Sequence, residues 1–226
     1  MVEYSETIPI QYEQGEARFM GMDVLVDPSV LIPRPETELL VRTAASLLTE
    51  KGQEEPLIVD MGTGSGAVSM GLARLMPDCR IIACDVSAEA LMVAEKNIHR
   101  YGYLDRVALL RTDMFKRLGD ENEGVVDAVV SNPPYVSDTD YEKLDAWVKA
   151  EPQIALKSGP EGMDHLSVLA AESGRFLKPG GIIAVEVAYD QAERVKRLFQ
   201  GQGFERVTGY RDLNGYERVI TGYRNG

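Results

Sequence analysis

The chain has 226 residues, 44% of them hydrophobic, and carries 24 Lys and Arg against 36 Asp and Glu, for a formal net charge of −12. This length suits one compact domain whose apolar residues can form a core without disulfides or a structural metal. The acidic balance counts against non-specific attraction to phosphate backbones, so a nucleic-acid substrate starts at a disadvantage.

Cysteine and histidine are sparse, and their spacing excludes a zinc knuckle. Cys79 and Cys84 form no CxxC pair, and neither lies near His99 or His165, so no metal-binding residues are predicted. Cysteines without a disulfide pattern fit a reducing compartment. The N-terminus has neither a basic start nor a long apolar run, and stretches such as 181–188 are shorter than a membrane span. We therefore expect a cytoplasmic protein without a membrane segment.

The first fifty residues read as a lead-in to a larger unit. Residues 16–27 alternate apolar and polar around Gly21, which predicts a β-hairpin. Residues 36–49 have helical spacing, and Pro35 and Glu36 suit a first helical turn. We interpret residues 1–50 as a hairpin and helix that pack on a catalytic domain formed by residues 51–226.

From residue 56 onward, apolar strands alternate with helical segments. The predicted strands are 56–61, 80–85, 107–113, 125–131 and 181–188. Apolar strands joined by helices indicate a parallel sheet covered on both faces. Residues 204–224 predict two further strands around Asn214 and Gly215, which would form an antiparallel pair at one sheet edge.

A glycine-rich loop follows the first of these strands. Asp60 ends the apolar run, and Gly62, Gly64 and Gly66 stand just before a helical segment. Glycines let the backbone turn sharply and approach a ligand, and a helix N-terminus presents free N–H groups. The GxGxG spacing differs from the GxGxxG dinucleotide fingerprint. The loop is a candidate ligand site, and a tight turn without a ligand is the alternative.

Two aspartates follow at the ends of the next two predicted strands. Asp85 comes about 20 residues after the loop, where α/β ligand sites place a carboxylate that accepts hydrogen bonds from ribose hydroxyls. Asp113 lies at the same rim and is placed to meet an adenine edge. Either one alone could instead cap a helix or sit in a solvated turn. Together with the glycine loop they predict an adenosine site along the carboxyl ends of the strands.

The fourth predicted strand ends in Asn132, Pro133, Pro134 and Tyr135. Two prolines remove two N–H donors, so this turn presents carbonyl oxygens beside the Asn132 amide and the Tyr135 ring. Two acceptors match the two hydrogens of a planar NH₂ group, and an aromatic face stacks on its plane. A rigid turn with no chemical role is the alternative.

These motifs carry a resemblance to a known family. GTGSG followed by Asp85 resembles the class I S-adenosylmethionine-dependent methyltransferases, and NPPY resembles the members that methylate planar nitrogens of adenine, guanine or glutamine. The stretch SVLIPRPETELLV at 29–41 is similar to the signature of the release-factor glutamine N5-methyltransferases. EPQIAL at 151–156, GMDHL at 162–166, FLKPGG at 176–181 and DLNGYERVITG at 212–222 agree in order and spacing. The resemblance spans nearly the whole chain, residues 15–224.

The resemblance implies a Rossmann-like α/β fold, with a seven-stranded, mostly parallel sheet, an antiparallel edge hairpin and a small N-terminal β-hairpin. It implies S-adenosylmethionine as cofactor, S-adenosylhomocysteine as product, and a peptide chain release factor as the protein substrate. The cofactor would be bound by Asp60, Gly62, Thr63, Gly64, Gly66, Asp85, Val86, Asp113, Met114 and Asn132. The substrate would be bound by Arg34, Pro35, Glu36, Asn132, Pro133, Pro134 and Tyr135, with Asn132, Pro133 and Tyr135 catalytic.

Two other functions stay open at this stage. The NPPY turn also suits an N-methyltransferase of exocyclic amines in rRNA, tRNA or DNA, which would need a basic groove beside Tyr135. Members of the family usually carry a helical N-terminal domain that helps bind the release factor, whereas this sequence begins at the hairpin. A cofactor-binding module that needs a partner for recognition is therefore the third reading.

Overall fold

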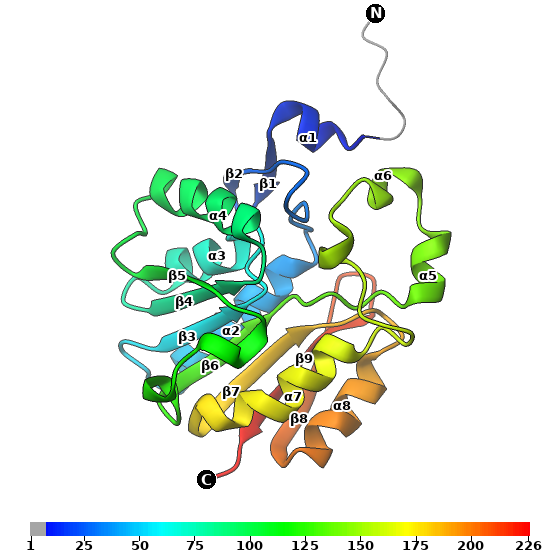
Figure 1. Ribbon diagram of the computed structural model, residues 1–226. Coiled ribbons are helices and arrows are strands. Elements are labelled where there is room, and N and C mark those ends of the chain that lie inside the picture. The colour runs from blue at the N-terminus through cyan, green and yellow to red at the C-terminus, as the bar shows by residue number, and fades with distance from the viewer. Residues whose placement is uncertain (1–7) are drawn as a thin grey trace, which may run out of the picture.

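The computed structural model describes residues 8–226, which are built around a seven-stranded sheet (Figure 1). The strand order is β5-β4-β3-β6-β7-β9-β8, and β9 alone runs opposite to its neighbours. The predicted parallel sheet with an antiparallel edge hairpin is confirmed. The strands are β3 (Leu57–Met61), β4 (Arg80–Asp85), β5 (Val107–Arg111), β6 (Val126–Ser131), β7 (Leu177–Glu186), β8 (Phe204–Arg211) and β9 (Glu217–Arg224).

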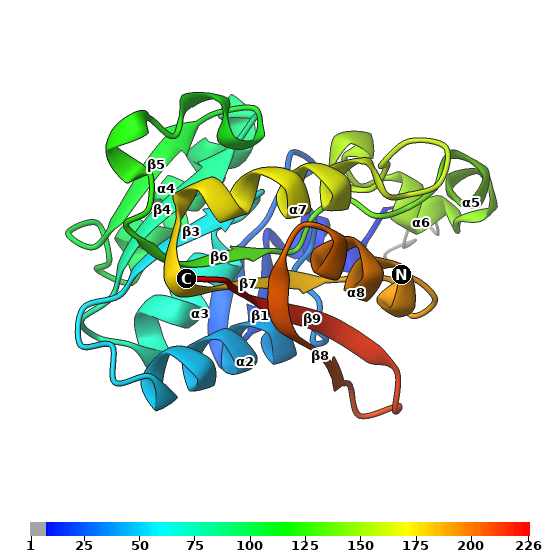
Figure 2. The same ribbon diagram turned by 90° about the horizontal axis from the view of Figure 1, so that it is seen from below.

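Helices cover both faces of this sheet, and Figure 2 shows α2 and α3 on one side and α7 on the other. The principal helices are α2 (Thr37–Glu50), α3 (Ala67–Leu75), α4 (Ala88–Arg100), α7 (Asp164–Phe176) and α8 (Ala192–Gly201). Short helical turns fill two connections: η1 (Met114–Arg117) and η2 (Asp120–Asn122) before β6, and α5 (Asp138–Lys143), α6 (Ala146–Lys149) and η3 (Gln153–Ala155) after it. No helix among the described residues is long and apolar enough to cross a membrane.

Two apolar cores form because successive strand residues point to opposite faces. Ile58 and Ala128 pack with α2, α3 and α4, whereas their neighbours Val59 and Val129 pack with α7 and α8. All six residues of β6 are buried. A strand covered on both faces is apolar throughout, which is why these segments could be recognised in the sequence.

The predicted N-terminal hairpin is present as β1 (Glu16–Phe19) and β2 (Met22–Leu25), preceded by α1 (Ile10–Gln14). Its two-residue turn has positive φ at Met20 (51°) and Gly21 (73°), the geometry that matches the twist of a hairpin. The hairpin shares the core that contains α2, α3 and α4. The boundary at residue 50 between a lead-in and a catalytic domain stays a prediction.

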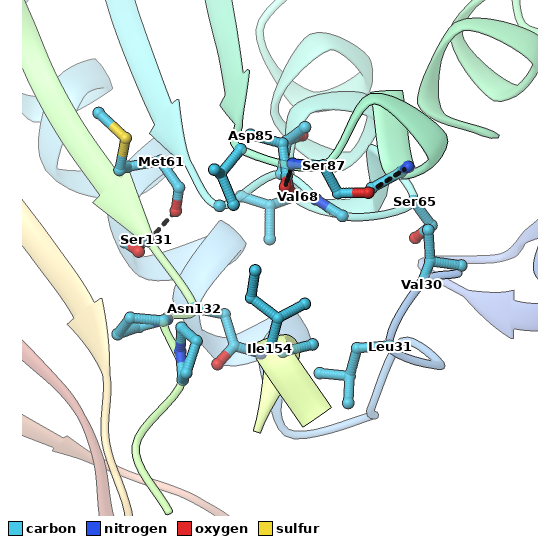
Figure 3. Close-up of a pocket in the computed structure, with 18 of the residues that line it drawn as sticks. Val30, Leu31, Met61, Ser65, Val68, Asp85, Ser87, Ser131, Asn132 and Ile154 are labelled. Atoms are coloured by element: carbon cyan, nitrogen blue, oxygen red, sulfur yellow. Dashed lines mark hydrogen bonds between the residues drawn. The ribbon is translucent and has the colours of Figure 1, made fainter. Parts of the chain in front are cut away.

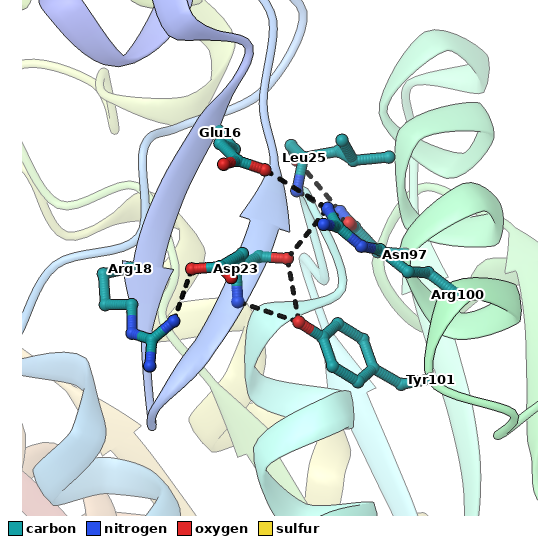
Figure 4. Close-up of polar contacts among 7 residues, drawn as sticks. All are labelled: Glu16, Arg18, Asp23, Leu25, Asn97, Arg100 and Tyr101. Atoms are coloured by element: carbon teal, nitrogen blue, oxygen red, sulfur yellow. Dashed lines mark hydrogen bonds and ion pairs between the residues drawn. The ribbon is translucent and has the colours of Figure 1, made fainter.

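Polar contacts also fix the hairpin to α4 (Figure 4). The buried Asn97 amide accepts a hydrogen bond from Leu25 N (2.7 Å) and donates to Leu25 O (2.9 Å) and to Ser65 O (2.9 Å). The Tyr101 hydroxyl accepts from Asp23 N (2.8 Å). One side chain, Asn97, therefore ties the hairpin to the glycine-rich loop.

Candidate functional site

A cavity of about 1020 Å³, its open mouth included, lies at the carboxyl ends of β3, β4 and β6 (Figure 3). Asp85 stands on one side, and Asn132 and Ile154 stand on the other. The glycine loop, the turns after β4, β5 and β6, residues 29–37 and η3 supply the walls. The predicted site residues that line it are Gly62, Thr63, Gly64, Asp85, Val86, Asp113, Met114, Asn132, Pro133 and Pro134.

The glycine loop wraps the carboxyl ends of β3 and β4. The amides of Gly62 and Thr63 donate to Cys84 O at 2.8 and 2.9 Å, which closes the turn. A Cβ on Gly64 would meet nothing within 4 Å, so open space lies beside the backbone there. A Cβ on Gly66 would lie 3.3 Å from the Ala94 Cβ. Gly66 thus serves helix packing and lies outside the cavity lining.

Asp60 lies beneath this loop, outside the lining. Its Oδ2 accepts from Thr63 Oγ1 (2.7 Å), Ser69 N (3.1 Å) and Ser69 Oγ (2.6 Å). Burial raises the pKa of Asp60 to about 6, and the hydrogen bonds from Ser69 and Thr63 oppose that rise. The carboxylate therefore shapes the loop from behind.

Asp85 ends β4 and faces the cavity. Its Oδ2 accepts from Gly64 N and its Oδ1 from Ser87 N, both at 2.9 Å. Burial raises the pKa of Asp85, and these backbone hydrogen bonds oppose the rise. Each carboxylate oxygen keeps a further lone pair, so Asp85 can bind two ligand hydroxyls while holding the loop.

The turn after β5 differs in detail from the expectation. The strand ends at Arg111, so Asp113 lies two residues beyond it, exposed at the rim and paired with Lys116. Met114 has φ of 49°, which is rare for a residue with a side chain. Thr112 Oγ1 donates to Met114 O at 2.9 Å and holds this conformation. Backbone strain at a cavity wall is a mark of functional sites.

Three residues of the NPPY turn, Asn132, Pro133 and Pro134, line the cavity. The Asn132 Nδ2 donates to Thr37 Oγ1 at 3.1 Å, which leaves Asn132 Oδ1 without a partner among the described residues. Within residues 8–226 no donor hydrogen-bonds to the Pro133 carbonyl oxygen either. Ser131 Oγ donates to Met61 O (2.6 Å) and anchors the turn to β3.

Tyr135 lies behind this turn, outside the cavity lining. Its hydroxyl donates to Glu186 Oε1 at 3.4 Å. Burial and the negative charge of Glu186 raise the pKa of Tyr135. The expectation that its ring stacks on the acceptor amide stays a prediction.

The predicted substrate residues of the lead-in lie just outside the cavity. The Arg34 guanidinium forms an ion pair with Glu151, whose side chain is fully buried, and also lies 5.7 Å from the Trp147 ring centre. Glu151 Oε2 accepts from Ile32 N at 3.0 Å. Pro35 is exposed and Glu36 is half-buried. Arg34 therefore joins the wall of residues 29–37 to the wall that carries η3.

Several lining residues were missed by sequence reasoning. The polar residues Thr37 and His165 line the cavity, and so does Ile154, although 56% of it is exposed. Burial lowers the pKa of His165, whose Nδ1 hydrogen-bonds Ser158 Oγ at 2.8 Å. These residues belong to segments that only the tertiary fold brings to the sheet edge. The family-like stretches PET and GMDHL were the one signal that could have singled out Thr37 and His165.

Comparison with known proteins identifies the family. Residues 36–201 match the family described as "Methyltransferase small domain". The release factor glutamine methyltransferase of Moorella thermoacetica is 38% identical over 96% of this chain and 75% of its own length. That of Bordetella pertussis is 40% identical over 95% of this chain and 77% of its own length. The chain belongs to the release factor glutamine methyltransferase family.

Solved structures agree with this assignment. The protein-(glutamine-N5) methyltransferase (release factor-specific) of Alicyclobacillus acidocaldarius is 30% identical to this methyltransferase, with a TM-score of 0.53 over 89% of this chain and 99% of that chain. The catalytic domain of hMettl16, solved with an RNA hairpin, has a TM-score of 0.70 at 15% identity, covering 97% of this chain and 79% of that chain. The latter likeness shows the Rossmann-like methyltransferase fold alone.

Proposed function

We propose that this methyltransferase transfers a methyl group from S-adenosylmethionine to the side-chain amide nitrogen of a glutamine in a peptide chain release factor. The substrate class is that named for relatives which align over nearly the whole chain. The net charge of −12 fits a protein substrate better than a nucleic acid. A cytoplasmic location, as the release factor requires, is part of the proposal.

The loop side of the cavity fits this cofactor. Asp85 has lone pairs for two ribose hydroxyls, and the open space beside Gly64 lets a ligand approach the backbone. Val86 and Met114 offer apolar surface to a flat base at the rim. When bound, S-adenosylmethionine supplies a methyl group on a positively charged sulfur that is a good leaving group.

The opposite side of the cavity would hold the acceptor. An amide nitrogen is a weak nucleophile, because its lone pair is delocalised into the carbonyl. Asn132 Oδ1 and the Pro133 carbonyl oxygen can accept the two N–H groups of a glutamine amide, and both interactions strengthen as positive charge develops on the nitrogen. Asn132 has no basic group at neutral pH, so it orients the acceptor and does not remove a proton. The surrounding walls exclude water and align the acceptor with the methyl donor.

The observation that carries the proposal is the orientation of Asn132. Because its Nδ2 is engaged by Thr37, its carbonyl oxygen is the group left for a ligand. Two acceptors side by side, at a turn that lacks two N–H donors, match the two N–H groups of an NH₂; a hydroxyl has only one proton to donate, and a carboxylate has none.

The test offers methyl-labelled S-adenosylmethionine together with release factor, ribosomal RNA, tRNA or DNA in parallel. We expect label in the release factor, located by mass spectrometry of its peptides on a glutamine side chain. Label in RNA or DNA would establish the nucleic-acid alternative in its place. Cofactor binding with no labelled acceptor would support the binding-module alternative.

A further inference from the structure

A second buried carboxylate, Glu186, lies behind the acceptor side of the cavity. It ends β7, and its side chain is almost fully buried. Oε1 accepts from the Tyr135 hydroxyl at 3.4 Å, whereas Oε2 makes no hydrogen bond of regular geometry among the described residues. A buried carboxylate with a free oxygen is costly, so its position calls for a role.

Thr37 connects this carboxylate to Asn132. The Thr37 Oγ1 accepts from Asn132 Nδ2, and the Thr37 side chain also lies beside Glu186, where it lowers the pKa of that carboxyl. A hydroxyl has one proton to donate and two lone pairs. An ionised carboxylate only accepts, and Glu186 Oε2 has no donor of regular geometry among the described residues, so it is the acceptor next to Thr37 that can receive the hydroxyl proton. Thr37 then has only lone pairs to offer Asn132, and the Asn132 NH₂ group must face it.

We infer that Glu186 is a positioning residue for the methyl acceptor: through Thr37 it fixes the Asn132 amide with Oδ1 toward the acceptor nitrogen. This inference rests on the proposed function. It involves three segments that meet beside the cavity: the start of α2 with Thr37, the NPPY segment with Asn132, and the end of β7 with Glu186.

The protonated form of Glu186 would reverse the arrangement. A neutral acid can donate to Thr37 Oγ1, and the Thr37 proton is then free to bond Asn132 Oδ1. The amide would turn its NH₂ group toward the cavity, where it opposes the NH₂ group of the acceptor. Orientation therefore depends on the charge of Glu186.

The surroundings of Glu186 place this change near neutral pH. Burial raises the pKa of Glu186 to about 7, while hydrogen bonding from Thr37 and the positive charge of Arg218 lower it. Glu36 at the start of α2 raises it, and the Tyr135 hydroxyl lowers it. Arg218 on β9 is itself paired with Asp212 at 3.3 Å. We expect kcat to fall as the pH goes below about 7.

The test measures kcat and KM for release factor between pH 5.5 and 9 in wild type, Glu186→Gln, Thr37→Val and Thr37→Ser. Gln both donates and accepts, so Glu186→Gln should lower kcat about tenfold at pH 8, the upper range for one net hydrogen bond, and flatten the acid limb. Thr37→Val should lower kcat similarly, and Thr37→Ser should restore it. KM for the cofactor should stay constant, and the exposed Glu205→Gln serves as the matched control.

A readout that needs no turnover separates this inference from the proposed function. The Asn132 side-chain NH₂ resonances, assigned against Asn132→Ala, should shift with a midpoint near pH 7 in wild type and not in Glu186→Gln. If release factor is not methylated, the proposed function fails while this titration still decides the orientation. Wild-type methylation with an unchanged acid limb in Glu186→Gln, or resonances that do not titrate, would overturn the inference.

Discussion

The two sides of the cavity are held together in different ways. The loop side is formed by residues 62–66 and Asp85, and it is held by hydrogen bonds from backbone amides. Gly64 N and Ser87 N both donate to Asp85, which is 21 and 2 residues away. On the turn side, formed by residues 131–135 with Thr37 and Glu186, side chains contact side chains over separations of 95 and 51 residues. A small-molecule site can thus be built from local backbone, whereas an acceptor site requires the whole fold.

The largest expected effect is the loss of kcat on replacing Asn132, a residue of the turn side. Asn132→Ala should lower kcat by about 10² to 10³, as when one preorganised transition-state hydrogen bond is removed, with cofactor affinity nearly unchanged. Single-turnover methyl transfer and calorimetry on the same samples measure both, and Asn122→Ala is the control. A stable variant with an undiminished rate would remove Asn132 from the mechanism.

Asn132→Asp sharpens the same comparison. The carboxylate keeps an acceptor but adds charge near the cofactor's sulfur and repels the Glu186 carboxylate through Thr37. Activity that survives with a shifted pH profile would indicate an electrostatic role for this position. A loss equal to that of Asn132→Ala would indicate that the geometry of the amide itself matters.

The ion pair between the two cavity walls tests how far the turn side depends on tertiary contacts. Arg34→Ala should lower the free energy of unfolding by about 3 kcal/mol, because it leaves the buried Glu151 without its partner. Arg42→Ala removes a surface pair with Glu38 and should cost less than about 1 kcal/mol. Urea unfolding compares them. Equal losses would show that the buried pair has no special role.

On the loop side, Asp85→Ala should weaken cofactor binding by about 1.5 to 3 kcal/mol, the range for hydrogen bonds to a charged group. KM for the release factor should change little, because the turn side stays intact. Asp113→Ala, at the exposed rim, should have a smaller effect. Unchanged affinity in Asp85→Ala, measured by calorimetry, would contradict the ribose assignment.

The remaining prediction has the opposite sign, because it is a gain in stability. The pKa of Glu186 is raised in the folded state to about 7, so the unfolded chain ionises first and stability is lost as the pH rises from about 4.5 to 7. Glu186→Gln cannot ionise and should exceed wild type by about 3 kcal/mol at pH 8, with no gain below about pH 4.5. The raised pKa of Asp60 contributes equally to the stability of wild type and of Glu186→Gln, so it cancels from their difference. Chemical unfolding at the two pH values checks the sign.

The sequence predicted the loop side better than the turn side for a physical reason. Gly62, Gly64 and Asp85 lie at strand ends whose apolar runs are visible in one dimension, and the parallel sheet brings those ends together. Asn132 was found because NPPY is locally unusual. Glu186 was missed because a glutamate at the end of an apolar strand has no local mark of burial, and only the fold places Thr37 against it. Arg34 was predicted to bind substrate, but no sequence pattern could reveal its pairing with Glu151.

Through Asn97, the N-terminal hairpin is coupled to the glycine-rich loop. Its amide bonds both peptide groups of Leu25 and the carbonyl of Ser65, so β2 and the glycine loop share one anchor. Segments that share an anchor open together, and a ligand that favours the closed loop lowers the frequency of that opening. Backbone amides of β2, which do not line the cavity, should therefore exchange their hydrogens with solvent more slowly when the loop is occupied. Deuterium uptake in residues 22–25 would then report occupancy of the glycine loop through Asn97.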